Sequence, residues 1–319
     1  MVHPAVSPQD AWMVHPAVSP RSKGFMGMPS ISRAQKMETI IFLLYTRDNP
    51  STPVTLDLNS KSSLAAVDTK LDTKVLIHGW HGNRDTLSQI KNAYVSKSDC
   101  NVIIVDWHSL AQSNMYPESK ADTEIVGART AQLLDHLADN GLDLSRVNCV
   151  GHSLGGHTVG IVGDRVTKSR VGMITGLDPA GPMYDYNSTP NKNKLDSEDG
   201  IFVLAVHTNA KRLGSKEMLS TVDVWVNDGT SQPGCSARME KATGLCSHLR
   251  VIDIWAESII GVQPIVGWQC ESWSTFEDGE CEKNFKIIMG DNINQSSRGL
   301  FFVPTGAKSP FAVLSEDDE

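Results

Sequence analysis

The chain has 319 residues, of which 40% are hydrophobic and 21% are charged, proportions that are ordinary for globular proteins. This length fits one large α/β domain or two small domains. The net charge of −8 at pH 7 and the lack of a basic block exclude an electrostatic basis for nucleic-acid binding. No apolar run approaches the roughly 18 residues that span a bilayer, and the N-terminus lacks the apolar core of a secretory signal peptide.

Residues 1–36 are predicted to be a disordered tail. The octapeptide MVHPAVSP occurs twice, at residues 1–8 and 13–20, in a stretch rich in Pro and Ser that has neither helical nor strand periodicity. We interpret it as a dispensable tail or as a misplaced start of the reading frame, with a propeptide or docking tail as the alternative. No second boundary is visible after it, so residues 37–319 are predicted to form a single domain.

Apolar strands and amphipathic helices alternate from Glu38 onward. Strands are predicted at residues 39–46, 74–78, 101–105, 171–177 and 201–207, and helices at residues 86–97 and 122–139. Fully apolar strands between helices are typical of a parallel sheet that is covered on both faces. The predicted fold is therefore α/β, with a mostly parallel central sheet and helices on both sides.

Residues 146–157, RVNCVGHSLGGH, contain a G-x-S-x-G motif around Ser153. An apolar run that favours a strand precedes the serine, and a segment that can form a helix follows it through Asp164. This context is typical of a nucleophile elbow, a sharp turn that projects the serine hydroxyl from the sheet edge. Glycines flank the turn because side chains there would collide with the neighbouring strand and helix. An ordinary glycine-rich turn is the alternative for this stretch alone.

A nucleophilic serine needs a base, and the base needs an acid that orients it. Hydrolases with this elbow carry them in the order Ser, Asp or Glu, His. Asp178 directly follows a predicted strand, where catalytic groups of such sheets lie, so we predict it to be the acid. Of the ten histidines, only His207 and His248 follow it. His207 ends an apolar strand and is interpreted as structural. His248 lies where a loop enters a predicted helix, residues 251–260, and is the predicted base.

Two backbone N–H groups are predicted to stabilise the oxyanion of the reaction. One belongs to Leu154, which follows the nucleophile. The other belongs to Trp80, in the loop after the predicted strand at residues 74–78. The indole of Trp80 is interpreted as a wall of the acyl site, with a plain core aromatic as the alternative.

The chain resembles the pancreatic (neutral) lipase family of α/β hydrolases in seven ordered motifs: VLIHGW, VIIVDW, VGHSLGGH, ITGLDPAGP, VHTN, QPGC and CSHLR. The resemblance covers roughly residues 40–312. It implies an α/β-hydrolase fold and the hydrolysis of lipid carboxyl esters by a triad of Ser153, Asp178 and His248. The chain ends soon after residues 301–305, so we expect no C-terminal β-sandwich domain and no colipase-type partner. The expected protein is a monomer without a cofactor that acts at a membrane or micelle surface.

Two surface loops cover the site in this family, and both are short here. The resemblance implies a disulfide between Cys235 and Cys246 that closes the lid, with ten residues between them, and the loop between Thr208 and Asp223 is compact and polar. Short loops resemble the phospholipase A1 branch. A triacylglycerol or galactolipid lipase is the alternative, and a non-catalytic lipid-binding or storage member is the second.

These two loops carry five basic residues and only two acidic ones, Glu217 and Glu240. They are therefore positively charged, whereas the chain as a whole is negative. We predict that this rim holds phosphate head groups or an anionic membrane surface, with solvated loop charge as the alternative. The rim bases are Lys211, Arg212, Lys216, Arg238 and Lys241.

The resemblance implies a second disulfide between Cys270 and Cys281. Cys100 and Cys149 remain, and each abuts an apolar strand. The resemblance implies that the strand before Trp80 separates these two strands, so we predict two buried free thiols rather than a third disulfide. Two disulfides favour an oxidising, extracellular location, although no signal peptide is visible in the sequence given.

The sequence also contains two glycosylation sequons and a segment similar to a calcium site. The sequons at Asn187 and Asn294 predict glycosylation if the chain is exported. The segment around Asp196 and Asp199 resembles a calcium-binding segment of some pancreatic lipases, but Asn191 and Lys194 stand where those have Glu and Arg. We therefore expect no bound metal, and a calcium ion there would be structural.

Overall fold

A computed structural model describes residues 31–186, 189–235, 237–261 and 263–313. Contacts group Arg33–Glu319 into one compact unit. Most of the predicted tail lies outside the described residues. Its last part differs from the prediction, because residues 33–36 belong to a helix, α1 (Arg33–Glu38). This helix is held by an ion pair of 2.6 Å between Lys36 Nζ and a carboxylate oxygen of Asp122.

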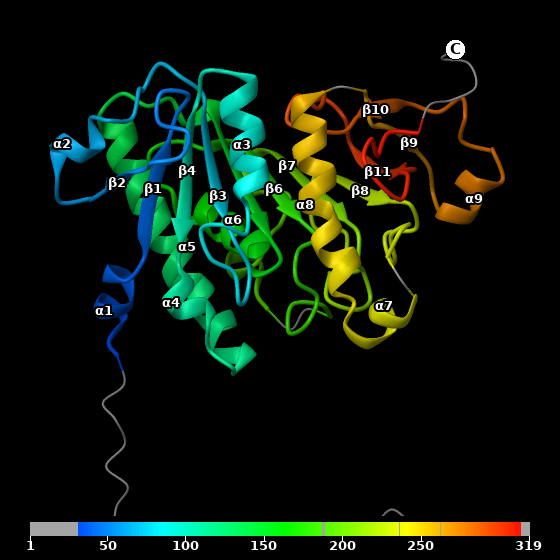
Figure 1. Cartoon of the computed structure of the whole chain (residues 1–319), viewed down its shortest axis with the longest axis horizontal. Coiled ribbons are helices and arrows are strands. Elements are labelled where there is room, and N and C mark those ends of the chain that lie inside the picture. Colours follow the sequence, from blue (N-terminus) through cyan, green and yellow to red (C-terminus); the bar gives the residue numbers. More distant parts are fainter. Residues whose placement is uncertain (1–30, 187–188, 236, 262, 314–319) are drawn as a thin grey trace, which may run out of the picture. The chain divides into compact units, whose positions relative to one another are not determined.

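The described residues contain one sheet of eleven strands, in the order β10-β9-β11-β8-β7-β6-β5-β3-β4-β1-β2 (Figure 1). The seven strands from β11 to β4 in this order pair in parallel, and the remaining strands pair antiparallel at the two edges. The strands are β1 (Ile41–Tyr45), β2 (Val54–Leu56), β3 (Thr73–Ile77), β4 (Asn101–Asp106), β5 (Val147–His152), β6 (Val171–Leu177), β7 (Gly200–His207), β8 (Val222–Val226), β9 (Val266–Gln269), β10 (Lys286–Ile288) and β11 (Gly299–Val303).

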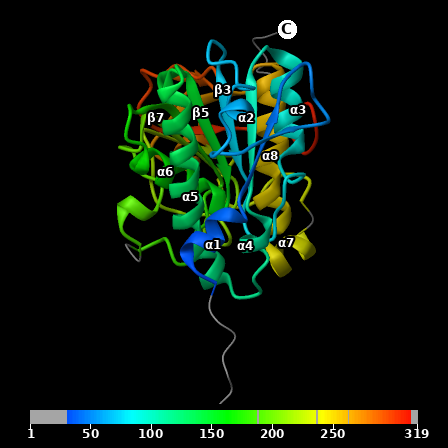
Figure 2. The ribbon, with the colours of Figure 1, turned by 90° about the vertical axis from the view of Figure 1, so that its left-hand side faces the viewer.

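Helices cover both faces of the sheet. Figure 2 shows α5 and α6 on one side of it, and α3 and α8 on the other. The predicted mostly parallel α/β sheet, covered on both faces, is therefore confirmed. The helices after α1 are α2 (Lys61–Leu64), α3 (Ser88–Lys97), α4 (His108–Ala111), α5 (Tyr116–Asp139), α6 (Leu154–Arg165), α7 (Ala237–Thr243), α8 (Leu245–Ile260) and α9 (Trp273–Glu277), with 3₁₀ turns at Leu144–Arg146 and Asn191–Asn193.

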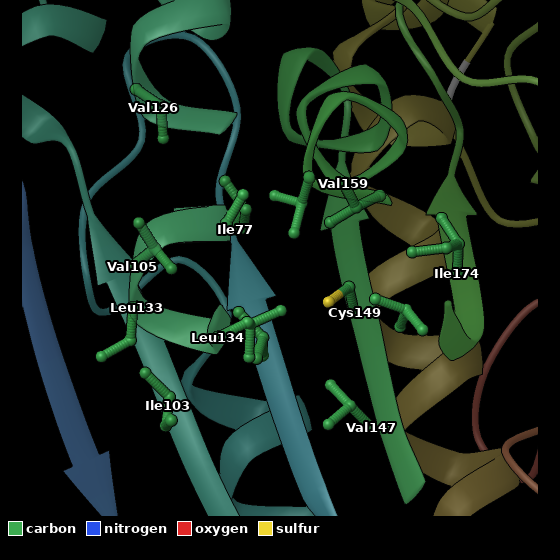
Figure 3. Packing of buried hydrophobic residues seen from close by; sticks show 14 of the residues in the cluster. Ile77, Ile103, Val105, Val126, Leu133, Leu134, Val147, Cys149, Val159 and Ile174 are labelled. Carbon is green, nitrogen blue, oxygen red and sulfur yellow. The ribbon is translucent and has the colours of Figure 1, made fainter. Parts of the chain in front are cut away.

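Successive side chains of the central strands point to opposite faces of the sheet, so the core has two layers. In β3, Val75 and Ile77 point into the cluster that α5 and α6 cover, whereas Leu76 points into the cluster under α3 and α8. Figure 3 shows Ile77 in the first layer with Val159 of α6. Because both faces are buried, the centre of the strand, Val75 to Ile77, is apolar on both sides, and only its amino end carries polar residues. This explains why the uninterrupted apolar runs of the sequence predicted strands.

Element boundaries differ from the prediction in two helices. The helix predicted to begin at Asp122 begins at Tyr116, with Pro117 in its first turn, where the missing proline N–H costs nothing. The helix predicted to begin at Val251 begins at Leu245, as considered below. The strands β2 and β8 to β11 were not predicted.

Asp291 fastens the C-terminal part of the chain to the amino end of the sheet. Its carboxylate accepts hydrogen bonds from Lys74 Nζ (2.7 Å), Tyr94 Oη (2.8 Å) and Asn148 Nδ2 (2.7 Å). The side chains of Lys74 and Asp291 retain only 11% and 15% of their exposure, so the ion pair is largely shielded from water.

Replacing Asp291 by Ala is expected to lower the free energy of unfolding by about 3 kcal/mol, because it leaves a shielded ammonium without a counter-ion. Urea denaturation measures this loss. The control is Asp99→Ala, which removes the exposed partner of Arg47 and should cost less than about 1 kcal/mol. Equal losses in the two variants would contradict the role assigned to Asp291.

Candidate active site

Ser153 occupies a strained turn between β5, which ends at His152, and α6, which begins at Leu154. Its φ of 59° and ψ of −120° lie outside the regions that residues with a side chain usually adopt. The flanking glycines are sterically required. A Cβ on Gly151 would lie 2.0 Å from the carbonyl oxygen of Gly155, and a Cβ on Gly155 would lie 2.1 Å from that of Ile77. The turn thus has the backbone of a nucleophile elbow.

The main chain of Ser153 joins this elbow to the neighbouring strand end. Its N–H donates to the carbonyl oxygen of Leu177 at 3.1 Å, and its own carbonyl accepts the N–H of Ala180 at 3.2 Å. Leu177 is the last residue of β6, so the nucleophile candidate is fixed directly beside Asp178.

Asp178 is fully buried and has both carboxylate oxygens occupied. Oδ1 accepts the backbone N–H groups of Thr208 (2.8 Å) and Asn209 (2.9 Å), in the turn after β7. Oδ2 accepts Nδ1–H of His248 at 2.5 Å. This last bond fixes the tautomer of the imidazole, because it places the proton on Nδ1 and leaves Nε2 able to accept one.

His248 lies in the first turn of α8, not in a loop before the helix as predicted. The helix begins at Leu245, after Gly244, whose φ is 69°. Ser247 is buried in this turn. Its N–H donates to Glu240 Oε2 (3.3 Å) and its Oγ accepts the N–H of Gln232 (2.8 Å). This turn is held by hydrogen bonds to distant residues and not by an apolar stripe, so the sequence shows no helical periodicity there.

His152 links the elbow to the helix that carries the predicted base. Its Nε2–H donates to the backbone carbonyl of His248 at 2.9 Å, and the two imidazole rings lie 4.6 Å apart. Burial, reinforced by the neighbouring His248, lowers the pKa of His152 to about 3. His152 therefore stays neutral at physiological pH and keeps the single proton that it donates.

The loop after β3 packs against the nucleophile candidate. A Cβ on Gly79 would lie only 2.7 Å from Cβ of Ser153, so the backbone leading into Trp80 runs beside the serine. Within the described part of the chain, the N–H groups of Trp80 and Leu154 have no hydrogen-bond acceptor. Both are thus available for an oxyanion, and their role in an oxyanion hole stays a prediction. The Trp80 indole is 37% exposed and donates to the carbonyl of Ser113 at 2.8 Å, at the edge of the site.

Two residues that the sequence analysis did not single out hold this loop. His78 contacts the carbonyl of Gly79 through Nδ1 (3.0 Å) and accepts the backbone N–H of Trp107 through Nε2 (3.3 Å). The Trp107 indole in turn donates to the carbonyl of His78 at 2.9 Å. Their positions directly after β3 and β4 were the available signal, because polar groups at strand ends border the site.

Gly214 is a third residue that the sequence analysis missed. A Cβ at this position would lie 2.4 Å from Oδ1 of Asp178. The compact loop between β7 and β8 can approach the buried carboxylate only because residue 214 has no side chain. A lone glycine in a polar loop gives little signal in the sequence.

Replacing Gly214 by Ala is expected to lower kcat for ester hydrolysis at least tenfold, because the methyl group displaces the carboxylate that orients His248. Initial rates on a soluble short-chain ester measure the effect. Gly306→Ala is the matched control, since its nearest neighbours would lie 3.7 Å from the added Cβ. Unchanged activity of Gly214→Ala in a folded protein would contradict this role.

The structure brings three of the five predicted rim bases to one cleft. Lys211, Arg212 and Lys216 line a cleft of about 250 Å³ with one acid, Asp185, and with Tyr186 and Gly214. The Lys216 ammonium lies 4.0 Å from the centre of the Tyr186 ring. Because Gly214 abuts Asp178, this cleft adjoins the predicted triad.

Arg238 is not among the residues that line this cleft. Arg238 is exposed on α7, and the side chain of Lys241 lies outside the described part of the structure. The two loop acids have other partners. Glu217 pairs with Lys194 at 3.2 Å, and Glu240 is buried, where it accepts Asn209 Nδ2–H at 2.9 Å.

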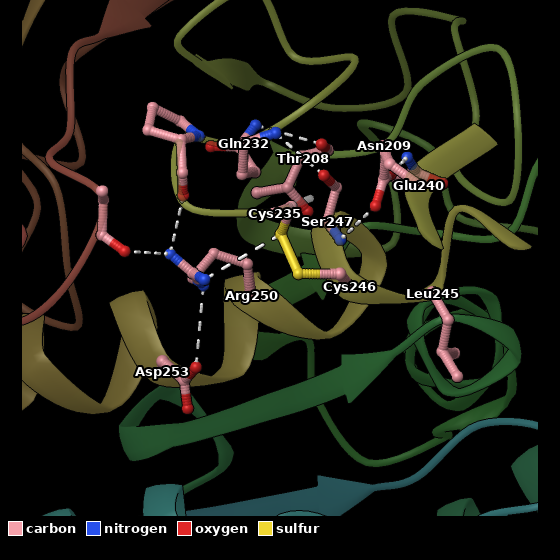
Figure 4. The surroundings of a disulfide bond; sticks show 12 residues. Thr208, Asn209, Gln232, Cys235, Glu240, Leu245, Cys246, Ser247, Arg250 and Asp253 are labelled. Atoms are coloured by element: carbon pink, nitrogen blue, oxygen red, sulfur yellow. Dashed lines mark hydrogen bonds and ion pairs between the residues drawn. A yellow bond between two sulfur atoms is a disulfide. The ribbon is translucent and has the colours of Figure 1, made fainter. Parts of the chain in front are cut away.

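Both implied disulfides are present, Cys235–Cys246 and Cys270–Cys281. Figure 4 shows the first, beside Arg250, whose guanidinium lies 3.9 Å from Cys235 Sγ. The same guanidinium donates to two backbone carbonyls, those of residues 233 and 307, and so joins the base of the lid to the C-terminal segment.

The two remaining cysteines are free and buried, as predicted. They flank β3, because Cys149 lies in β5 and Cys100 directly precedes β4. Burial raises the pKa of both thiols, that of Cys149 to about 12, so neither is a reactive thiolate at physiological pH.

One acid of the calcium-like segment is buried within the chain. Asp199 is buried, and its Oδ2 accepts the N–H of Asp196 at 2.7 Å. Burial raises the pKa of Asp199 to about 9, and the expectation that no metal binds here stays a prediction. Of the two sequon asparagines, Asn294 is exposed and Asn187 lies outside the described residues.

The order of the strands, the elbow after β5 and the acid after β6 define an α/β-hydrolase fold. The chain belongs to the lipase family, whose model, described as Lipase, matches residues 18–311.

Three relatives show how similar known members are. Lipase member H of Danio rerio is 34% identical over 75% of this chain and 53% of its own length. Phospholipase A1 member A of Mus musculus is 32% identical over 75% and 53%, and lipoprotein lipase of Bos taurus is 33% identical over 76% and 56%. The chain thus spans about half the length of the curated relatives it matches.

One solved structure is an α/β hydrolase enzyme from a deep-sea metagenome library. It has a TM-score of 0.34 at 15% identity and covers 54% of this chain and 65% of its own, a likeness too low to bear on function. Among the described residues, none of the helices is long and apolar enough to cross a membrane.

Proposed function

We propose that the chain is a serine hydrolase of lipid carboxyl esters, and specifically a phospholipase A1 that cleaves the sn-1 acyl chain of phospholipids. The assignment as a hydrolase rests on the 2.5 Å hydrogen bond between Asp178 Oδ2 and His248 Nδ1, together with a serine in a strained elbow. Membership in the lipase family supports the lipid ester as substrate.

In the proposed mechanism, Nε2 of His248 takes the hydroxyl proton of Ser153 as the serine attacks the ester carbonyl. The N–H groups of Trp80 and Leu154 stabilise the oxyanion. His248 then protonates the leaving lysolipid, and the same imidazole activates the water that hydrolyses the acyl-enzyme. Because the base must be neutral to accept this proton, activity should fall in acid.

The basic cleft supports a phospholipid as the substrate. Its three bases adjoin the proposed triad and would meet a phosphate head group. Large apolar side chains are exposed on the loops and helix starts around the same edge of the sheet, where they could enter a lipid surface. They are Trp80, Met115, Met183, Tyr186, Met218, Leu245 and Leu249.

Two alternatives differ in substrate or in chemistry. A triacylglycerol or galactolipid lipase would use the same three residues, and lipoprotein lipase is among the relatives. A non-catalytic lipid-binding member would be expected to lack one of them, whereas Ser153, Asp178 and His248 are all present. The two disulfides support an extracellular location. We expect a monomer at the lipid surface.

Replacing Ser153 by Ala is expected to abolish labelling by an organophosphate and to lower kcat at least a thousandfold, because the nucleophile is lost. Mass spectrometry of the labelled protein and a panel of phosphatidylcholine, a galactolipid and a triglyceride measure both. Labelling that persists in Ser153→Ala would contradict the assignment. Faster cleavage of the triglyceride or galactolipid would favour the alternative lipase.

Replacing the five rim bases by Gln is expected to lower hydrolysis of anionic phospholipid vesicles at least tenfold, with little change on a soluble short-chain ester, because only the vesicle presents phosphate to the cleft. A matched control replaces five exposed lysines elsewhere by Gln: Lys61, Lys70, Lys192, Lys283 and Lys308. A parallel loss on both substrates, or the same loss in the control, would contradict a role for the rim.

A further inference from the structure

His207 is a second buried histidine beside the candidate acid, and its surroundings differ from those of the other buried histidines. It is the last residue of β7 and is fully buried. Nε2 lies 2.8 Å from Oδ1 of Asp223 in β8, and Nδ1 lies 3.1 Å from the backbone carbonyl of Ser215. The indole of Trp225 covers the ring at 5.1 Å between centres.

Both partners of this ring, the Ser215 carbonyl and the Asp223 carboxylate, accept hydrogen bonds from it. A backbone carbonyl has no hydrogen to give. The Asp223 carboxylate already receives the backbone N–H groups of Leu219 (3.1 Å) and Ser220 (3.2 Å), which stabilise its negative charge. Each nitrogen of His207 therefore needs its own proton, and the ring that satisfies this geometry is an imidazolium.

His157 provides the comparison, because it is equally buried but faces one acceptor and one donor. Its Nε2–H donates to the carbonyl of Ala180 (2.7 Å), and its Nδ1 accepts the N–H of Leu195 (3.2 Å). Burial lowers the pKa of His157 to about 3. Burial also disfavours the charged form of His207, but the hydrogen bond and charge of Asp223 outweigh it, and the pKa of His207 is raised.

His207 connects the turn after β7 with the loop at residues 214–215, and these two segments also enclose Asp178. Thr208 and Asn209, which follow His207, donate both N–H groups to Oδ1 of Asp178. Ser215, which accepts from the other ring nitrogen, follows Gly214, the residue that packs on the same oxygen. The charged groups facing the ring are Asp223 from β8 and Asp178 from the end of β6.

We propose that His207 is a permanently charged imidazolium that positions Asp178 and supplies a positive field to it, so that the Asp178–His248 pair remains set for catalysis. His207 touches no substrate and acts through Asp178 as a positioning residue. The charge state is a property of the fold alone, whereas its effect on catalysis rests on the proposed function.

The charge state is tested first, by ¹⁵N–¹H NMR of the full chain labelled in its histidine rings. At pH 8.5, where ordinary histidines carry one ring proton, one ring is expected to show protons on both nitrogens, and His207→Gln is expected to remove that signal. The wild-type spectrum decides the matter even if the variant does not fold. Absence of any doubly protonated ring at this pH would overturn the proposal. The measurement needs no activity, so it stands apart from the proposed function.

The catalytic effect is tested by the pH profile of kcat/KM on a soluble ester. In His207→Gln the Asp223 carboxylate loses its counter-ion, and the added negative field favours the protonated base. The acidic limb is therefore expected to move up by about one pH unit. His157→Gln, which removes an equally buried but neutral ring, should leave the limb in place. Limbs that coincide in His207→Gln and wild type would overturn the electrostatic role, whatever the change in kcat.

Discussion

The rest of the site depends on the hydrogen bonds that the buried carboxylate of Asp178 accepts. A buried charge is tolerated only when its hydrogen-bonding capacity is filled. Here the donors come from two segments distant in the chain, the turn after β7 and the first turn of α8. Placing this one group therefore fixes where the loop between β7 and β8 lies, and where His248 points.

The sheet makes that precision possible. Parallel pairing brings the ends of β3, β5 and β6 to one edge, and the two apolar layers hold these strands rigidly. The strained backbone of Ser153 persists because Leu177 and Ala180 bind it on the neighbouring strand end. Strain at the elbow is thus maintained by the same strand that carries Asp178.

Prediction from the sequence succeeded where the physical cause is local and failed where it is not. The central strands are continuous apolar runs because both faces are buried, and the elbow needs glycine at fixed spacing. The first turn of α8 was missed because Ser247 is held by Gln232 and Glu240 rather than by an apolar stripe. Likewise, the sequence identified His207 as buried and structural. Its charge depends on Ser215 and Asp223, which no spacing pattern connects to it.

The disulfide at the base of the lid has a mechanical consequence. The Cα atoms of Cys235 and Cys246 are 5.7 Å apart, so the segment between them has both ends fixed at nearly one point. While the disulfide is intact, such a segment forms a closed loop and cannot extend into a long arm. Its anchor, Cys246, is two residues from His248 on the same helix. The disulfide and the proposed base therefore lie in the same helix, which holds the anchor of this segment and the imidazole at a fixed separation.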